Sequence, residues 1–262
     1  MYHVLFLNYH SINICVKSEI YHVDPVYSVR QEAFEAQMKL IRELHIPVLS
    51  LPQYLQAVKL KQPFAQNSLV ITFDDGFLTD YEIAYPILKS YGFPATFFVC
   101  LVNIKSQYRW RQMREMTQDD YTIGSHTISH GYLSDLSPAD LVRELSQSKN
   151  IIEEKTGSPV KFLAPPGGRY NARVIETAAN LGYEALLTTR VGLNHSGSDV
   201  MQLNRWTVRY HTTLTEFGKM ITQDRSTLRS KILKSQALNL GKKIIGNSAF
   251  DQLRELLLPP HS

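Results

Sequence analysis

The stretch Ser68–Phe77, SLVITFDDGF, decides the fold of this chain. It begins with a short apolar, β-branched run and ends in two adjacent carboxylates, Asp74 and Asp75, followed by Gly76. The run has the length and composition of a buried parallel strand, and catalytic groups in α/β folds gather at the carboxyl ends of such strands. Because two neighbouring buried charges are unfavourable without a cationic partner, the pair is a first indication of a metal site.

A second stretch, Tyr121–His130 with the sequence YTIGSHTISH, contributes two histidines. His126 and His130 are four residues apart, and on one helical turn this spacing places both imidazoles on the same face. Neutral imidazoles together with a carboxylate favour a borderline divalent ion such as zinc. Taken alone, an HxxxH spacing is more often a chance pair of surface histidines, and a DD pair often caps a helix. Their occurrence together, in this order, favours the metal site.

Composition limits the possible classes of protein. The chain has 262 residues, of which 44% are hydrophobic and 20% charged, values that suit one large α/β domain or a smaller one with an appendage. Cys15 and Cys100 stand in apolar runs and fit no disulfide framework or CxxC motif, so we expect buried thiols. The apolar start has no basic region and no small-residue cleavage site, and no stretch has transmembrane length. We therefore expect a cytoplasmic protein.

The net charge of +4 is concentrated toward the C-terminus. From Arg205 onward, ten Lys or Arg stand against four Asp or Glu, a local charge of +6. Such asymmetry can indicate an anionic partner, but no recognition motif or aromatic-interleaved basic patch points to nucleic acid. The basic, partly amphipathic stretch Leu228–Leu258 is more typical of a tail packed on the main domain. The alternative is peripheral contact with a membrane surface containing anionic lipids.

Strand-like and helix-like stretches alternate along most of the chain, which favours an α/β barrel-like fold. We expect strands over 2–8, 46–49, 68–73, 95–102, 160–163, 185–189 and 203–210, and helices over 28–44, 51–60, 80–91, 137–155, 172–181 and 215–221. Ser28 is expected to cap the first of these helices. Residues 104–115 are read as a rim loop or a solvated helix. The predicted division is a barrel domain over residues 1–222 and a helical basic extension over residues 223–262.

The motifs TFDDG and HTISH, followed by a Pro/Gly-rich strand end, resemble in this order the polysaccharide deacetylase family. These carbohydrate esterases share the chitooligosaccharide deacetylase homology domain, and the resemblance covers roughly residues 1–220. It implies a distorted (β/α) barrel of deacetylase type and metal-dependent removal of acetyl groups from N-acetylated sugars. It also implies that Asp75, His126 and His130 are ligands of a divalent metal ion, with zinc expected, and that Asp74 is the general base.

The resemblance leaves the general acid to be chosen among three histidines. The family usually places it in a Leu-x-His motif near the C-terminus, where this chain offers only His195 and His211. A branch acting on poly-N-acetylglucosamine looks circularly permuted, with the acid in an N-terminal Tyr-His motif at a strand end. The stretch LNYHSIN matches that pattern, and the following SVRQEAFEAQMKLI and HIPVLSL resemble the same branch. His10 is therefore the implied acid, with His211 second.

The third motif departs from the family pattern. Many members carry Arg-x-Pro-Tyr-Gly, whereas this chain has LAPPG over residues 163–167. The arginine that orients the base is absent there, and Pro166 has no N–H to give to an oxyanion. The resemblance leaves Gly167 or Gly168 as the donor in a substrate-binding turn that includes Pro165, unless the metal carries more of the oxyanion charge. It leaves Arg169 as a possible cationic partner for Asp74.

The implied activity is hydrolysis of linear amides. The substrate would be an N-acetylglucosamine-containing polysaccharide, oligosaccharide or lipid-linked glycan, and exopolysaccharide biosynthesis is the expected setting. If the basic tail contacts lipid, the enzyme would act at the cytoplasmic membrane face. One alternative is an O-acetyl esterase that uses the same site on a decorated glycan. Another is a non-catalytic carbohydrate-binding protein of the same fold, which only the altered third motif favours.

Overall fold

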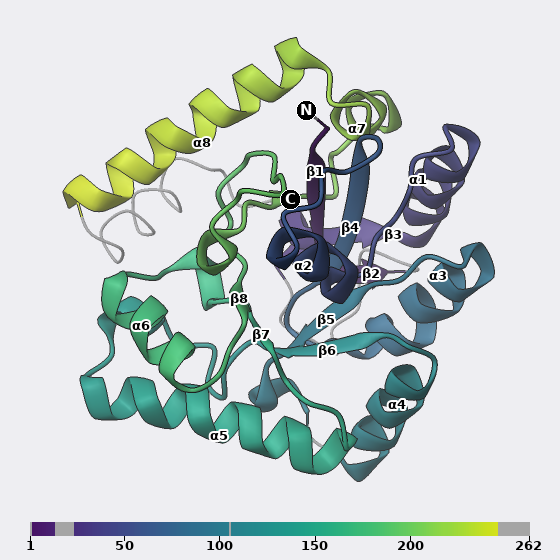
Figure 1. Ribbon diagram of the computed structural model, residues 1–262. Helices are drawn as coiled ribbons and strands as arrows, with labels where there is room; N and C mark the ends of the chain where they lie inside the picture. The colour runs from purple at the N-terminus through teal and green to yellow at the C-terminus, as the bar shows by residue number, and fades with distance from the viewer. Residues whose placement is uncertain (1, 14–23, 105, 246–262) are drawn as a thin grey trace.

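Figure 1 shows the computed structural model, which describes residues 2–13, 24–104 and 106–245, with side chains up to residue 237. Its centre is a curled sheet of seven parallel strands in the order β8-β7-β6-β5-β4-β1-β9. The strands are β1 (Val4–Tyr9), β4 (Ser68–Phe73), β5 (Thr96–Val99), β6 (Thr122–Ser125), β7 (Phe162–Leu163), β8 (Ala185–Leu186) and β9 (Trp206–Thr207). A parallel bridge between Leu187 and Leu203 links the two sheet edges. The sheet thus curls into the expected distorted (β/α) barrel.

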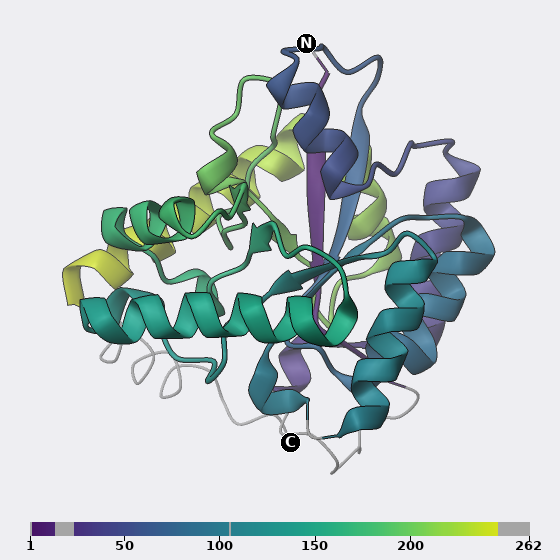
Figure 2. The ribbon, with the colours of Figure 1, turned by 60° about the horizontal axis from the view of Figure 1, so that its bottom comes forward.

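Helices surround this barrel, and α2 (Leu51–Lys59) lies across the amino ends of its strands (Figures 1 and 2). The other α-helices are α1 (Gln31–Glu43), α3 (Tyr85–Tyr91), α4 (Gln107–Gln118), α5 (Pro138–Thr156), α6 (Ala172–Asn180), α7 (Leu214–Ile221) and α8 (Arg225–Ile245). A π-helical segment, η2 (Asp80–Ala84), precedes α3, and β2 (Ser11–Asn13) pairs with β3 (Ser28–Arg30) in a separate small sheet. Short 3-10 turns are η1 (Pro25–Tyr27), η3 (Leu101–Asn103), η4 (Leu133–Asp135), η5 (Pro166–Gly168) and η6 (Val200–Gln202).

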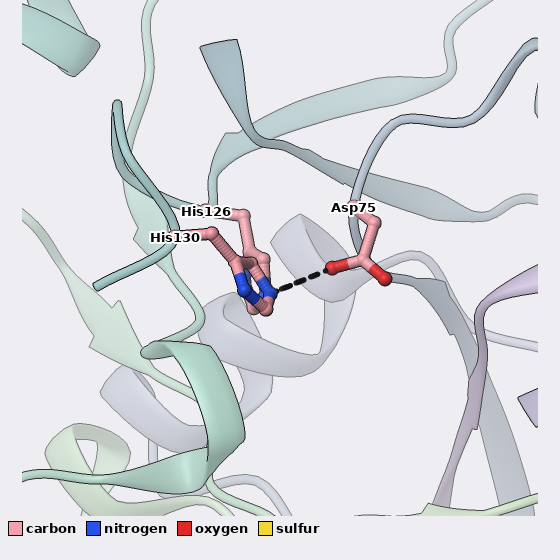
Figure 3. Close-up of side chains that lie close together, drawn as sticks. All are labelled: Asp75, His126 and His130. Carbon is pink, nitrogen blue, oxygen red and sulfur yellow. Dashed lines mark hydrogen bonds and ion pairs between the residues drawn. The ribbon is translucent and has the colours of Figure 1, made fainter. Parts of the chain in front are cut away.

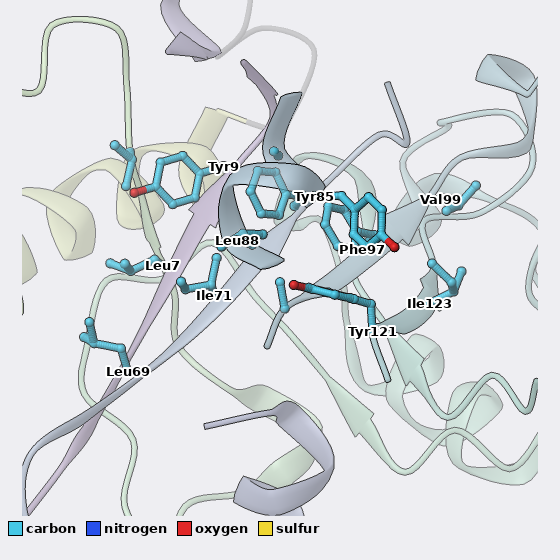
Figure 4. Packing of buried hydrophobic residues seen from close by; sticks show 14 of the residues in the cluster. Leu7, Tyr9, Leu69, Ile71, Tyr85, Leu88, Phe97, Val99, Tyr121 and Ile123 are labelled. Carbon is cyan, nitrogen blue, oxygen red and sulfur yellow. The ribbon is translucent and has the colours of Figure 1, made fainter. Parts of the chain in front are cut away.

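Alternation along β1 and β4 separates the barrel interior from the helix layer, because successive strand residues face opposite sides. The outward residues of the two strands belong to the main core: Leu5, Leu7, Tyr9, Leu69, Ile71 and Phe73. Figure 4 shows four of them, Leu7, Tyr9, Leu69 and Ile71, among their buried neighbours. Inward residues Val4, Phe6 and Val70 join α2 in a second apolar cluster. Farther along the same strands the buried residues that continue this alternation are polar: Asn8, Thr72 and Asp74. The interior therefore changes from apolar to polar toward the carboxyl ends of the strands.

A buried ion pair lies in this polar part of the interior. Arg205, which precedes β9 and is fully buried, donates Nη1 to Asp74 Oδ1 at 2.7 Å and Nη2 to Asp74 Oδ2 at 2.8 Å. The same guanidinium donates to Thr188 O and to Asn8 Oδ1, both at 3.0 Å. The Asn8 amide in turn donates to Asp74 Oδ2 at 3.1 Å. One network thus joins β1 and β4 to the segments that follow β8 and precede β9.

The ion pair determines the charge state of Asp74. Burial alone would raise the pKa of this carboxyl, but the Arg205 guanidinium and the nearby His126 outweigh it, and the pKa is lowered. A carboxyl whose pKa is lower in the folded than in the unfolded state stabilises the fold above the unfolded pKa of about 3.9. That contribution is lost as the pH falls through the folded pKa. Asp74 is therefore an ionised carboxylate at neutral pH.

Most expected elements are present, and the differences have local causes. Ser28 does not cap α1: it pairs with Ser11 in the small β2–β3 sheet, so the helix begins only after Arg30, without a side-chain cap. The expected strand over 46–49 is reduced to one bridge between Val48 and Leu69. Residues 104–115 fall largely on α4, and the expected strand 203–210 is regular only over β9. Cys100 is buried as expected, while Cys15 lies outside the described residues.

The described start of α8 packs on the barrel. Leu228 is buried, Lys231 forms an ion pair with Glu216 of α7, and Ser235 Oγ accepts the Val191 N–H at 3.3 Å. Among the described residues, no helix combines the length and the apolar character needed to cross a bilayer. Residues 246–262 of the expected basic tail lie outside the described part, so the division of the chain at residue 222 stays a prediction.

Arg205→Met should lower the free energy of unfolding by about 3–5 kcal/mol at neutral pH, because it leaves Asp74 as an unpaired buried charge. Burial then dominates and raises the pKa of Asp74, so protonation at lower pH relieves the penalty. The deficit should shrink as the pH falls from about 8 to about 4, and urea unfolding across this range measures it. Arg143→Met on α5, whose side chain is 58% exposed, is the control and should lose less than about 1 kcal/mol. A pH-independent deficit in Arg205→Met would contradict the assignment.

Candidate metal centre and active site

Three side chains converge at the carboxyl ends of the strands, and Figure 3 shows both imidazoles directed at the carboxylate: Asp75, His126 and His130. One ligand atom of each lies within 4.8 Å of the others. Asp75 Oδ1 is 3.3 Å from His126 Nε2 and 3.1 Å from His130 Nε2. His126 is buried, whereas His130 is exposed, so the cluster opens toward solvent. The structure thus brings together the three residues that the sequence indicated, and their donor set suits a divalent metal ion.

The cluster favours positive charge, and a divalent cation would replace the proton that lies between the imidazoles and Asp75. His126 Nδ1 lies 2.6 Å from Ala164 O, so this nitrogen donates its proton to the backbone and Nε2 is left to bind a metal. Burial would raise the pKa of Asp75, but hydrogen bonds from His126 and His130 hold it well below its usual range. Burial likewise would lower the pKa of His126, yet the carboxylates of Asp74 and Asp75 raise it. The cluster therefore combines an ionised carboxylate with an imidazole of fixed orientation.

The stretch between the two histidines is not helical, so the expectation that one helical turn presents both imidazoles is wrong. β6 ends at Ser125, and His126 directly follows it. Thr127 and His130 have φ angles of 72° and 63°. Positive φ is uncommon outside glycine, and for a β-branched residue it is a genuine outlier. An irregular loop, not a helix, therefore carries both histidines, and its strained residues lie among the candidate ligands.

Asp74 and Asp75 have separate partners although they are neighbours. Asp74 continues the inward face of β4, whereas consecutive residues in a regular strand point to opposite faces. A φ of 79° at Asp75 ends the strand geometry and lets its side chain meet the imidazoles. Two side chains bond to the backbone carbonyls of this turn. Asn103 Nδ2 donates to Asp75 O and Arg109 Nη2 donates to Gly76 O, each at 2.9 Å. One carboxylate is thereby left free of the candidate metal cluster.

His10 follows β1 and lies near both carboxylates. Its ring stacks on Tyr27, with ring centroids 4.7 Å apart. Burial lowers the pKa of His10 below its ordinary value, and the charges of Asp75 and Asp74 offset this shift only in part. His10 Nδ1 is buried and has no hydrogen-bond partner within the described part of the chain. The candidate acid thus has a fixed ring within electrostatic reach of the candidate base.

The two late histidines are placed differently. The ring of His195 lies 6.2 Å from the ring of His3, just before β1, and therefore at the opposite end of the barrel from His10. His211 follows β9 and makes an edge contact with Tyr210 at 5.2 Å between ring centroids. His10, in contrast, lies close enough to Asp75 and Asp74 for their charges to act on its pKa. This placement favours His10 as the acid, although its role stays a prediction.

Arg169 does not pair with Asp74, so that part of the sequence interpretation is wrong. Its guanidinium lies over the Tyr132 ring, 5.2 Å from the centroid. The cationic partner of Asp74 is Arg205, which is 131 positions away in the sequence. Sequence reasoning missed Arg205, because its only signal was an arginine within the strand-like stretch 203–210. Closure of the barrel brings Arg205 to Asp74.

The Pro/Gly stretch after β7 forms a tight turn beside the ligands. Gly167 and Gly168 have φ angles of 59° and 64°, and a Cβ on Gly168 would lie only 2.1 Å from Thr189 Oγ1. Gly168 donates its N–H to Pro165 O at 2.9 Å. Among the described residues, the Gly167 N–H has no acceptor. Gly167 is therefore the glycine of this pair with a free donor, and the substrate contacts predicted for this turn stay predictions.

Two sequence comparisons agree with this geometry. The sequence model of the family described as polysaccharide deacetylase matches residues 61–186. YxkH of Bacillus subtilis, a protein assigned by name to the polysaccharide deacetylases, is 32% identical over 196 residues, which cover 74% of this chain and 70% of YxkH. The poly-beta-1,6-N-acetyl-D-glucosamine N-deacetylase of Staphylococcus aureus strain MRSA252 is 30% identical over 161 residues. In that match the aligned region covers 55% of each protein.

Solved structures share the barrel. The Streptococcus pyogenes deacetylase PplD, determined in complex with acetate, superposes with a TM-score of 0.74 at 26% identity, over 84% of this chain and 97% of PplD. IcaB from Ammonifex degensii superposes with a TM-score of 0.72 at 20% identity, over 85% of this chain and 97% of IcaB, a likeness of fold alone. The barrel, the motifs and the relatedness to YxkH lead to one conclusion. The chain belongs to the polysaccharide deacetylase family.

Proposed function

We propose that this chain removes N-acetyl groups from a glycan built of N-acetylglucosamine units, with zinc as its metal ion. The observation that carries the proposal is the convergence of Asp75, His126 and His130 beside a separate, ionised Asp74. The staphylococcal relatives, named for the deacetylation of poly-beta-1,6-N-acetyl-D-glucosamine, support this substrate class. The match covers about half of each relative, so the length and linkage of the substrate belong to the proposal.

Asp74 is suited to act as the general base. An ion bound by the three ligands would polarise the acetyl carbonyl and acidify a water molecule. Asp74 then accepts the proton of the attacking water, because Arg205 keeps its carboxylate ionised. The two parallel bonds from Arg205 and the bond from Asn8 fix the orientation of the carboxylate. Burial limits competing solvent and strengthens each of these interactions.

His10 and Gly167 complete the proposed reaction. An amide nitrogen leaves poorly as an anion, so His10 donates a proton to the departing sugar amine. Its stacking on Tyr27 restricts rotation of the ring. The unengaged Gly167 N–H is suited to donate to the oxyanion of the tetrahedral intermediate. The proposed base and acid follow different strands, β4 and β1. These strands pair in parallel, so both groups lie at the same end of the sheet.

The site geometry bears differently on the two alternatives, the O-acetyl esterase and the non-catalytic binding protein. An O-acetyl esterase would use the same groups on an ester, so geometry alone does not separate it from an amidase. The non-catalytic binding protein rested only on the altered third motif. Arg205 supplies Asp74 with the cationic partner that this motif lacks, which removes the main support for that alternative.

Zinc-loaded protein should release acetate from N-acetylglucosamine oligomers with β-1,6 linkages, and a chelator should abolish the release. Asp74→Asn should lower kcat by at least about 100-fold, because the amide cannot accept the proton. Asp120→Asn, at an exposed aspartate after α4, is the matched control and should keep full activity. Release from O-acetylated sugars alone would select the esterase instead. Equal activity of Asp74→Asn and wild type would remove Asp74 as the base.

His10→Ala should distinguish the acid by its dependence on the leaving group. Hydrolysis of the N-acetyl sugar should fall at least about 100-fold, because the amine departs only when protonated. Hydrolysis of an activated aryl acetate should fall much less, because a phenolate leaves without protonation. Steady-state rates on both substrates measure the difference, with His211→Ala as the control. If His211→Ala shows this selective loss and His10→Ala does not, the acid is His211.

Membrane contact through the C-terminal tail, and with it a location at the cytoplasmic membrane face, stays a prediction. Its support is the local excess of basic residues after Arg205. The described start of α8 packs against α7 instead of presenting a free apolar face. Cosedimentation with phosphatidylglycerol vesicles at low salt tests the contact, since electrostatic attraction is strongest there. Absence of cosedimentation would end this part of the proposal.

A further inference from the structure

The loop between the two histidine ligands commits its backbone N–H groups to side chains. Glu144 Oε2 accepts the N–H of Ile128 at 2.8 Å and that of Ser129 at 3.2 Å. The next N–H, that of His130, donates to Thr127 Oγ1 at 3.2 Å. In a helix each of these groups would bond to a carbonyl four residues earlier. The capture of these three donors explains why the HxxxH stretch is a loop and not a helix.

Two carbonyl groups of the same loop accept hydrogen bonds from the main chain of η3. Thr127 O accepts the N–H of Leu101 at 3.1 Å, and Ile128 O accepts that of Val102 at 2.9 Å. These bonds come from the main chain of η3 and do not depend on which side chains are present. On the opposite side, the N–H groups of Ile128 and Ser129 depend on one carboxylate. Glu144 is therefore the side chain whose loss would free this loop.

Glu144 is rigidly placed. It is 9% exposed and stands on α5 between Leu141 and Leu145, both fully buried in the main core. A carboxylate so anchored can hold strained backbone, and the loop has such strain at Thr127 and His130. Glu144 is not a member of the candidate ligand cluster, so any effect on the metal must pass through the loop conformation.

We infer that Glu144 is a positioning residue for the metal centre. Its carboxylate selects the loop conformation in which Nε2 of His126 and of His130 both reach Asp75, and it thereby raises the affinity for the ion. This inference rests on the proposed function, because it takes these three residues as the ligands. It goes beyond that function because it names Glu144, a residue on α5 outside the ligand cluster, as the group that fixes the ligand geometry.

The same helix offers a matched control. Glu153, also on α5, has its Oε1 accept the Val160 N–H at 2.8 Å and the Lys149 ammonium at 3.0 Å. It therefore makes the same kind of side-chain to backbone bond, but to the segment before β7 and away from the histidine loop. Loss of Glu153 reports the general effect of removing such a bond from α5.

The test is the zinc affinity of the metal-free full chain, measured by competition with a chromophoric chelator. Glu144→Ala should weaken zinc binding by about 10- to 100-fold, in the range known for residues that orient metal ligands. Glu144→Gln should stay within about threefold of wild type, because its amide oxygen can still accept both N–H groups. Glu153→Ala should also stay within about threefold. The d–d absorption of the cobalt-substituted protein should change in Glu144→Ala alone, which reports ligand geometry independently of activity.

Several outcomes would overturn the inference. Wild-type zinc affinity in Glu144→Ala would do so, as would an equal loss in Glu153→Ala or in Glu144→Gln. Should Glu144→Ala not fold, Glu144→Asp retains the charge but shortens the side chain by one methylene and should weaken zinc binding in the same way. The proposed function fails separately, if wild type binds no zinc or if Asp75→Ala binds it unchanged.

Discussion

The ion pair between Asp74 and Arg205 is the interaction on which the rest of the site depends. A carboxylate at this depth would be neutral without a cation, and a neutral carboxyl cannot serve as a base. Arg205 supplies the charge, two parallel hydrogen bonds and, through Thr188 and Asn8, a link to the neighbouring strands. Toward the amino ends of the strands the barrel interior is filled with apolar side chains. Toward the carboxyl ends the buried polar groups form hydrogen bonds with one another.

The second constraint is the backbone conformation at the strand ends. Asp75, Thr127 and His130 all have positive φ, and each lies where a strand has given way to a loop. Such conformations persist only when surrounding contacts over-determine them. Here the contacts are the hydrogen bond that Asn103 donates to Asp75 O and the hydrogen bonds that Glu144 accepts from the histidine loop. The candidate ligands are thus placed by residues that do not themselves belong to the ligand cluster.

Much of the fold and part of the site were predictable from the sequence, because the informative residues were close together along the chain. Three segments each carry a local pattern: the strand before Asp74, the HTISH stretch and the Tyr-His strand end. The barrel brings them together at the carboxyl ends of its parallel strands. Arg205 was not predictable, since nothing near it in the sequence indicates Asp74 as its partner. The helix predicted for His126 and His130 was wrong because Glu144, on a different element, captures the N–H groups. Ser28 was misplaced for a similar reason, its pairing with Ser11. The catalytic roles of these residues stay predictions.

The position of β1 between β4 and β9 affects the order in which the parts of the site assemble during folding. Asn8 and Arg205 are hydrogen-bonded although 197 positions separate them. Contacts of such long range form late, after shorter loops have closed. The pairing of β1 with β4, the contacts of Asp75 with both histidines, and the bonds that Glu144 and Ala164 make to the histidine loop involve only residues up to 164. A nascent chain can therefore bring its candidate metal ligands together before Arg205, the counter-ion of Asp74, has emerged from the ribosome. With the roles proposed for these residues, the ligand cluster can assemble before β9 is synthesised, whereas Asp74 gains its cationic partner only afterwards.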